Sequence, residues 1–342
     1  MYKVPGVYIE EKDTLRLSVT TGATAVPAFV CAATAFGGTA PYRRFNSWLD
    51  VHAGLADEAE KLPISDSLQI YFENGGGYCY AIDVTKLEAS LDQLDDVTLL
   101  VQAGHAESVA VIAAACKKYP VFGIYDADQA GGAGKPLTPP VGATDPQGAV
   151  YGPALKKGET PFFASAAVAG VYCRVDRERG VWKAPANVAI EGGYTVSPLL
   201  AEQPSDNGVN ALCTFTGGAP LVWGARTLAP TGNWRFVPVR RLFNAVEKDI
   251  KKAMSVAVFE PNNAYTWEMV RGAIDNYLHQ LWADGALLGE TPGQAYSVLV
   301  GLGVTMTDED LRNGQMKVKV GLAAVRPAEQ IILQFSQKMN GA

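Results

Sequence analysis

The chain has 342 residues, enough for two domains that each bury a core. Hydrophobic residues make up 48% of it and charged residues 19%, a composition typical of globular proteins and unlike that of disordered chains. The net charge of −6 argues against a nucleic-acid-binding protein, which needs a basic surface to displace counterions from phosphates. We therefore expect a folded protein with no nucleic-acid partner.

Targeting signals and cysteine pairs are missing from the sequence pattern. The first six residues do not form a basic-then-apolar signal segment, and the longest apolar stretch, residues 24–35, is too short to span a bilayer. We expect a protein that is made and assembled in the cytoplasm, without direct membrane insertion. The five cysteines are dispersed and odd in number, which favours free thiols over a disulfide framework.

Strand-like and helix-like segments alternate after residue 21. The expected strands are 25–34, 78–82, 97–101 and 121–125, and the expected helices are 64–73, 87–94 and 108–118. This alternation predicts an α/β layered domain with a partly parallel sheet over residues 21–191. The stretch 129–158 is rich in glycine and proline and is predicted to be a long exposed loop.

The last third of the chain has a different pattern. One amphipathic helix is expected over 239–258 and a second over 267–283. Apolar residues then recur with a period of two, which predicts the strands 296–300, 316–322 and 330–336. Residues 192–328 therefore read as an α+β domain of two helices on a small sheet.

Both ends of the chain carry short strand-forming segments outside these two domains. One is the apolar triplet Val7–Ile9, and the other holds Ile331, Leu333 and Phe335. Domain ends more often fray into polar tails, and a strand this short needs a partner edge.

No segment has the spacing of a known catalytic or metal site. Gly131–Lys135 resembles a phosphate loop, but Gln129 stands where the first glycine belongs and Pro136 where a hydroxyl residue belongs. The three histidines have no zinc-ligand spacing, and a nucleophile elbow is absent. We predict no catalytic, cofactor or metal site, although carboxylates brought together only by the fold leave no local pattern.

The long helix of the last third carries a basic stripe. Arg241, Lys248 and Lys252 are spaced i, i+7 and i+11, and Lys251 lies beside them. One interpretation is an ordinary solvated face, partly paired with Glu247. The other is a docking stripe for an acidic partner surface.

Segments along most of the chain resemble the contractile tail sheath family. They are, in order, PGVYIEE (5–11), TAVPAFV (24–30), FENGGGYCY (72–80), GVY (170–172), RGVWKAPAN (179–187), WGARTL (223–228), WRFVPVRR (234–241), FEPNN (259–263) and VRPAEQIIL (325–333). The short length most resembles the sheaths of extracellular contractile injection systems of the antifeeding-prophage and Photorhabdus virulence cassette type. Residues 129–165 carry little of the resemblance.

The resemblance implies a structural subunit and no enzyme. Such a subunit polymerises into a helical sheath of stacked rings around an inner tube, meets baseplate and cap proteins, and contracts by repacking. It exchanges strands with its neighbours through two arms, here residues 1–20 and 329–342, which flank an outer domain (21–191) and an inner domain (192–328).

In such arms the exchanged side chains would be Val7, Tyr8, Ile9 and Glu10 at the start and Ile331, Leu333 and Phe335 at the end. The basic stripe of Arg241, Lys248, Lys251 and Lys252 would dock the inner tube. Two alternatives stay open: an α/β enzyme with a site assembled by the fold, and another tail or baseplate component.

Overall fold

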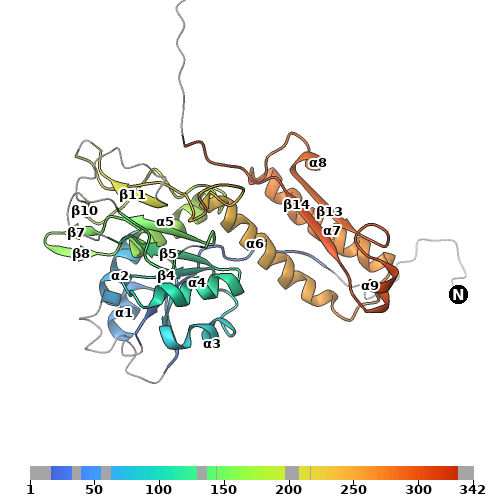
Figure 1. The fold of residues 1–342 in the computed structure, drawn as a ribbon, viewed down its shortest axis with the longest axis horizontal. Coiled ribbons are helices and arrows are strands. Elements are labelled where there is room, and N and C mark those ends of the chain that lie inside the picture. The colour runs from blue at the N-terminus through green and yellow to red at the C-terminus, as the bar shows by residue number, and fades with distance from the viewer. Residues whose placement is uncertain are drawn as a thin grey trace, which may run out of the picture. The chain divides into compact units, whose positions relative to one another are not determined.

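The computed structural model describes residues 17–32, 40–54, 63–128, 137–143, 145–196, 208–215 and 217–329. These residues form two compact units (Figure 1). The sheet unit contains 22–248 and 324–329, and the hairpin unit contains 17–21 and 249–323. The two arm segments Val7–Glu10 and Ile331–Phe335, and the candidate loop Gly131–Lys135, lie outside the described residues.

A nine-stranded sheet forms the centre of the sheet unit, in the order β2-β3-β1-β4-β5-β6-β11-β12-β9. Its bounds are β1 (Pro27–Cys31), β2 (Tyr42–Phe45), β3 (Cys79–Asp83), β4 (Leu99–Val101), β5 (Phe122–Asp126), β6 (Gly148–Gly152), β9 (Val188–Ala189), β11 (Val209–Cys213) and β12 (Leu221–Trp223). Strands β3 to β11 in this order run parallel, while β2, β12 and β9 pair antiparallel. The predicted mixed α/β fold with a partly parallel sheet is confirmed.

Helices cover both faces of the sheet (Figure 1). The helices of this unit are α1 (Trp48–Gly54), α2 (Pro63–Glu73), α3 (Leu87–Leu91), α4 (Ser108–Lys118), α5 (Ala164–Arg179) and the start of α6 (Val237–Met254). Leu99 packs with residues of α2 and α5, and its neighbour Leu100 packs on the other face with residues of α3 and α4. Successive strand side chains point to opposite faces, so strands buried on both sides read as continuous apolar runs.

The prediction of a loop over 129–158 is wrong for residues 148–152. Residues 148–152 form the buried strand β6, which lies between β5 and β11. Its glycines are required by close packing: a Cβ at Gly148 would lie 2.6 Å from Tyr125 Cε2, and one at Gly152 would lie 2.7 Å from Ala127 Cβ. Glycine in a strand interior often marks such a close approach rather than a loop.

A small antiparallel sheet lies elsewhere in the sheet unit. It has the order β10-β7-β8 and is built from β7 (Leu155–Lys157), β8 (Thr160–Phe162) and β10 (Thr195–Val196). Leu155 and Phe162 are buried and face each other across the β7–β8 pair.

The hairpin unit contains the end of α6, η5 (Ser255–Ala257), α7 (Ala264–Ala283), α8 (Pro292–Ala295), β13 (Tyr296–Val300), α9 (Asp308–Arg312) and β14 (Val318–Leu322). Strands β13 and β14 pair antiparallel, with Val298 opposite Val320. Asn263 caps α7 by accepting a hydrogen bond from the Thr266 N–H at 3.1 Å, and Asp249 of α6 accepts one from the Tyr277 hydroxyl of α7 at 2.8 Å. The expected helix and first two strands of this region are present within a few residues.

The compact units do not divide the chain where the sequence does. The division in the middle of the chain falls at residues 248–249, whereas the sequence suggests 191–192. The reason is that β11 pairs with β6 and β12 pairs with β11, so residues up to 223 complete the large sheet. The outer and inner domains of an assembled sheath stay a prediction.

Candidate functional site

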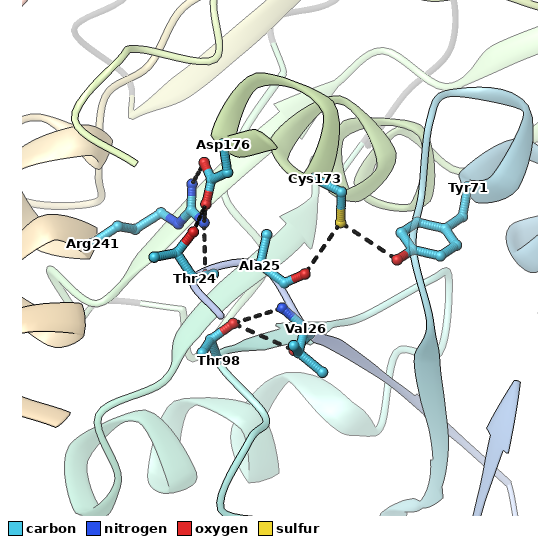
Figure 2. A network of polar contacts seen from close by, with 8 residues as sticks. All are labelled: Thr24, Ala25, Val26, Tyr71, Thr98, Cys173, Asp176 and Arg241. Atoms are coloured by element: carbon cyan, nitrogen blue, oxygen red, sulfur yellow. Dashed lines mark hydrogen bonds and ion pairs between the residues drawn. The ribbon is translucent and has the colours of Figure 1, made fainter. Parts of the chain in front are cut away.

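A buried ion pair joins α6 to α5 inside the sheet unit (Figure 2). Arg241 donates from Nη1 to Asp176 Oδ1 at 3.0 Å and from Nη2 to Asp176 Oδ2 at 2.7 Å. The two side chains are 2% and 4% exposed. The guanidinium also lies 4.5 Å from the centre of the Tyr172 ring. Two parallel hydrogen bonds and a stacked aromatic are the geometry in which arginine is tolerated in a protein interior.

The same pair holds the segment that leads into β1. Arg241 Nη2 also donates to the Thr24 carbonyl at 3.1 Å, and the Thr24 hydroxyl donates to Asp176 Oδ2. Two residues further on, the Val26 N–H donates to Thr98 Oγ1 at 2.8 Å (Figure 2). The chain is therefore fixed to the sheet unit from Thr24 onward, shortly after the predicted N-terminal arm of residues 1–20.

The Arg241 guanidinium stays protonated in the folded protein. Burial alone would lower the pKa of Arg241, but the charge of Asp176 and its hydrogen bonds together outweigh burial and raise that pKa. A buried pair of this kind adds little net stability over an apolar replacement, but removing one partner leaves an uncompensated charge. Arg241 and Asp176 are therefore interior anchors of the fold.

This result corrects the predicted basic stripe. Arg241 is buried and does not share an exposed face with the lysines. Lys248 is partly buried and donates from Nζ to the Val97 carbonyl at 3.1 Å, whereas Lys251 and Lys252 are exposed. The helical spacing is real, but the first turns of α6 lie inside the sheet unit. Spacing along a helix does not reveal where its surroundings change from protein to water.

A second arginine holds Glu329, the first residue of the predicted C-terminal arm. Arg226 Nε lies 3.0 Å from both carboxylate oxygens of Glu329, and its Nη2 donates to Oε2 at 2.6 Å. Three residues earlier, Arg326 donates to Asn233 Oδ1 at 3.2 Å. Glu329 begins the predicted arm, whose remaining residues lie outside the described part of the chain. We name the Arg226–Glu329 pair the arm clamp.

The two strands of the hairpin unit have unpaired edges among the described residues. β13 and β14 pair with each other in a two-stranded sheet, and α7 packs against β13. A two-stranded sheet is marginal by itself, and its open edges are templates for a further strand. The side chains alternate, with Val298 and Val320 partly buried and Leu299 and Lys319 exposed.

Exposed apolar side chains are concentrated on the hairpin unit. Of the twelve large apolar residues that are exposed in the described part of the chain, eight belong to it: Val256, Val258, Phe259, Tyr265, Leu288, Leu299, Leu302 and Val304. Phe259 is fully exposed and has a positive φ of 71°, a rare conformation for an aromatic residue. Exposed apolar surface on a small unit is typical of a subunit that is covered in an assembly.

Asp126 is the residue of the sheet unit that most resembles a site residue. It lies partly buried at the carboxyl end of β5, where open α/β sheets commonly bind ligands, and the loss of solvent around its carboxyl raises its pKa. Its oxygens, however, accept hydrogen bonds from the Ser165 N–H and hydroxyl, both at 2.8 Å, and from the Gly104 N–H at 3.0 Å. Asp126 therefore caps the start of α5.

The described residues contain no group of three or more histidine, cysteine, aspartate or glutamate side chains placed to hold a metal ion. No described helix is both long and apolar enough to cross a membrane. All five cysteines are free thiols, and four of them are buried.

Within the described residues, the sheet unit has a buried ion pair as an anchor, and the hairpin unit has open strand edges and exposed apolar side chains, the features of a structural subunit that assembles with other copies. Residues 230–338 match the family model of the phage tail sheath C-terminal domain. A search of curated protein sequences found no match.

Solved structures match the whole chain. The chain is 45% identical to a chain of the PVC sheath complex, from an extracellular contractile injection system in the contracted state, with a TM-score of 0.86 over 99% of this chain and 98% of that one. It is 38% identical to a chain of the anti-feeding prophage (AFP) helical sheath in the contracted state, with a TM-score of 0.82 over 99% of this chain and 100% of that one. The sheath tail protein of Desulfitobacterium hafniense, at 11% identity and a TM-score of 0.62 over 86% and 93%, shares the fold.

The chain belongs to the contractile tail sheath family. It is a structural subunit of a contractile, phage-tail-like sheath, and its relatives are sheath proteins rather than enzymes. The resemblance read from the sequence, and the prediction of a structural role, are confirmed.

Proposed function

We propose that this chain polymerises into a helical sheath around an inner tube and contracts by repacking its subunits while strand-exchange arms keep neighbours linked. The observation that carries the proposal is the open two-stranded sheet of β13 and β14. Strand addition to such an edge gives affinity through main-chain hydrogen bonds and register through alternating side chains.

The two chain ends supply the matching strands. Val7, Tyr8, Ile9 and Glu10 at one end and Ile331, Leu333 and Phe335 at the other have the apolar content and alternation of edge strands. Each added backbone hydrogen bond contributes about 0.5–1.5 kcal/mol net, so an arm of five paired residues stays bound while the compact bodies repack. Contraction then draws on differences in subunit packing, with no nucleotide consumed.

The partners follow from the same proposal. Solved AFP baseplate structures, one of them in the contracted state, contain chains 38% and 39% identical to this one. We infer that the sheath begins on a baseplate, ends at a cap protein, and is assembled in the cytoplasm before the particle is released. Residues 21–191 would face outward and 192–328 would line the tube.

Arm exchange is tested by deleting residues 1–15 or residues 330–342. Each truncated chain should remain a folded monomer, because the buried apolar residues of the described chain lie between Val26 and Met306, but it should form no sheath. Circular dichroism and thermal melting check the fold, and negative-stain electron microscopy of the full-length and truncated proteins checks assembly. Ridged cylinders of normal length from either truncation would contradict arm exchange.

Docking of the inner tube is assigned to Lys251 and Lys252 in the last turn of α6, which are exposed. Reversing both charges (K251E with K252E) should leave sheath subunits folded but abolish their recovery with the tube protein in co-expression. The matched control is K117E with K118E, an exposed lysine pair in the last turn of α4. Equal tube recovery from both double variants would exclude Lys251 and Lys252 as a docking site.

A further inference from the structure

We infer that Arg226 is a positioning residue for strand exchange, because the arm clamp fixes the point and direction in which the C-terminal arm leaves its subunit. The inference rests on the proposed function, since it concerns the arm that the proposal assigns to a neighbour. The proposed strand exchange otherwise involves only the arms and the strands that receive them, and the inference adds Arg226 of the sheet unit to it.

The clamp stands on a rigid base. The Arg226 N–H donates to Asn210 Oδ1 at 2.7 Å, and Asn210 Nδ2 donates to the Arg226 carbonyl at 2.8 Å. Asn210 is buried in β11, 3% exposed, and its Nδ2 also donates to the Val150 carbonyl of β6. Two strands of the large sheet therefore hold the Arg226 backbone. The Arg226 side chain, which carries the guanidinium, therefore extends from a backbone that is held in place.

The segment that the clamp receives is also constrained. Arg326 precedes Pro327, which fixes its own φ and keeps the residue before it extended. Arg326 bonds Asn233, and Glu329 bonds Arg226. The four residues 326–329 are thus tied to the sheet unit at both ends, close to where the arm begins.

The geometry differs from that of an ordinary surface pair. Lys118 and Glu88 meet through one contact, with side chains 54% and 53% exposed. Arg226 and Glu329 are 15% and 28% exposed and make three contacts across the carboxylate. A planar fork against a carboxylate sets orientation as well as distance, which a lysine cannot do.

The clamp shortens and aims the free arm. With the clamp closed, the chain beyond the last anchor is residues 330–342; with it open, the last anchor is the Arg326 bond to Asn233, and the chain beyond it begins at Pro327. The local concentration of a tethered strand at its acceptor falls roughly as the −3/2 power of tether length, so 16 residues in place of 13 lower it about 1.4-fold. Without the clamp the arm also no longer leaves its subunit in one direction, which lowers the local concentration further. The loss applies to every subunit of the polymer.

The test is a charge swap. Glu329→Arg or Arg226→Glu alone should raise the critical concentration for sheath assembly about fivefold or more, because like charges then repel the arm root. The double swap should return it to within about twofold of the wild type, because the pair is restored in reverse. Sedimentation of assembled sheath gives the concentration, and thermal melting of the monomer should be nearly unchanged in all three. The control swap Lys118→Glu with Glu88→Lys should assemble normally.

Each outcome decides the inference. Wild-type assembly of Glu329→Arg would overturn it, and this variant alone suffices if Arg226→Glu fails to fold. Failure of the double swap to restore assembly would also overturn it. The deletion of 330–342 separates this inference from the proposed function: normal assembly without the arm contradicts arm exchange itself. Failed assembly of that deletion, with normal assembly of the swap variants, contradicts only the clamp.

Discussion

At the residue scale, paired arginines hold the parts of the sheet unit that precede and follow its core. Arg241 joins α6, α5 and the segment that leads into β1 through Asp176 and Thr24. Its neighbour Arg240 is also buried, lies 4.1 Å from the Trp234 ring and donates from Nε to Asn244 Oδ1 at 2.9 Å. The start of α6 is thus fixed by charged side chains that have specific partners, which favours one packing arrangement over others.

Arg241→Met should lower the free energy of unfolding by about 3–5 kcal/mol, because it leaves the Asp176 carboxylate buried without its partner. Arg241→Met combined with Asp176→Leu should recover most of that loss, since no uncompensated charge remains. Urea unfolding of the monomer gives both values. The control Arg271→Met, in an exposed pair with Glu268, should change little. A single Arg241→Met variant as stable as the wild type would show that the pair is not an anchor.

At the element scale, close approaches of the backbone determine how the helices and strands pack. In α5, a Cβ at Gly170 would lie 2.5 Å from the Tyr71 carbonyl oxygen of α2. These helices lie side by side over the same face of the sheet. Gly272 of α7 has open space where a Cβ would be. Close packing therefore excludes a side chain at Gly170, whereas Gly272 has room for one.

Gly170→Ala should destabilise the protein, and Gly272→Ala should stabilise it. Alanine in a helix interior is favoured over glycine by about 0.5–1 kcal/mol, which is the expected gain at position 272. At position 170, overpacking against backbone costs about 1–3 kcal/mol and outweighs that gain. Thermal or urea unfolding of the two variants measures the difference. A Gly170→Ala protein more stable than the wild type would contradict the close α2–α5 contact.

Sequence periodicity predicted the elements better than their assembly. The helix expected over 108–118 is observed at those residues, because its apolar positions and ends have local patterns. The sequence does not predict strand β6, because its glycines are needed for close packing against Tyr125 and Ala127, which are distant in sequence. The compact sheet unit extends past residue 191 because β11 pairs with β6 about sixty positions earlier, and the outer and inner domains stay a prediction.

The candidate site shows the same limit. The arm clamp joins residues 103 positions apart, and no spacing rule connects them. The resemblance to sheath proteins did include both segments, 223–228 and 325–333, but it did not pair Arg226 with Glu329. The helical spacing of Arg241 with Lys248 and Lys252 predicts an exposed stripe, and only the position of Asp176 shows why Arg241 is buried instead.

At the scale of the whole molecule, ionisable groups that are neutral when buried are distributed through the core. Burial raises the pKa of the Cys31 thiol to about 12, with a smaller contribution from the charge of Asp83. Burial also raises the pKa of Cys116 on α4 and of Tyr172 on α5. These groups lie on both faces of the sheet, so the fold as a whole prefers their neutral forms.

The monomer should therefore lose stability as the pH rises above 9. A folded pKa above the unfolded value of 9.0 means that the native state binds more protons, so the Cys31 contribution is complete below pH 9 and is lost between pH 9 and about 12. Cys31→Ala should reduce the slope of unfolding free energy against pH by up to about 1.4 kcal/mol per pH unit in that range. The partly buried Cys213, changed to alanine, is the control and should reduce it less. An unchanged slope in Cys31→Ala would contradict the raised thiol pKa.

The arm clamp also sets an order of events during synthesis. Glu329 leaves the ribosome about a hundred residues after Arg226, when the large sheet has already been translated. A nascent subunit can thus fold its sheet while the C-terminal arm has not yet been aimed, and chains interrupted before residue 329 lack the contact altogether. Under the proposed arm exchange, only chains translated at least that far would donate a directed strand, and incomplete chains would not enter a growing polymer through this link.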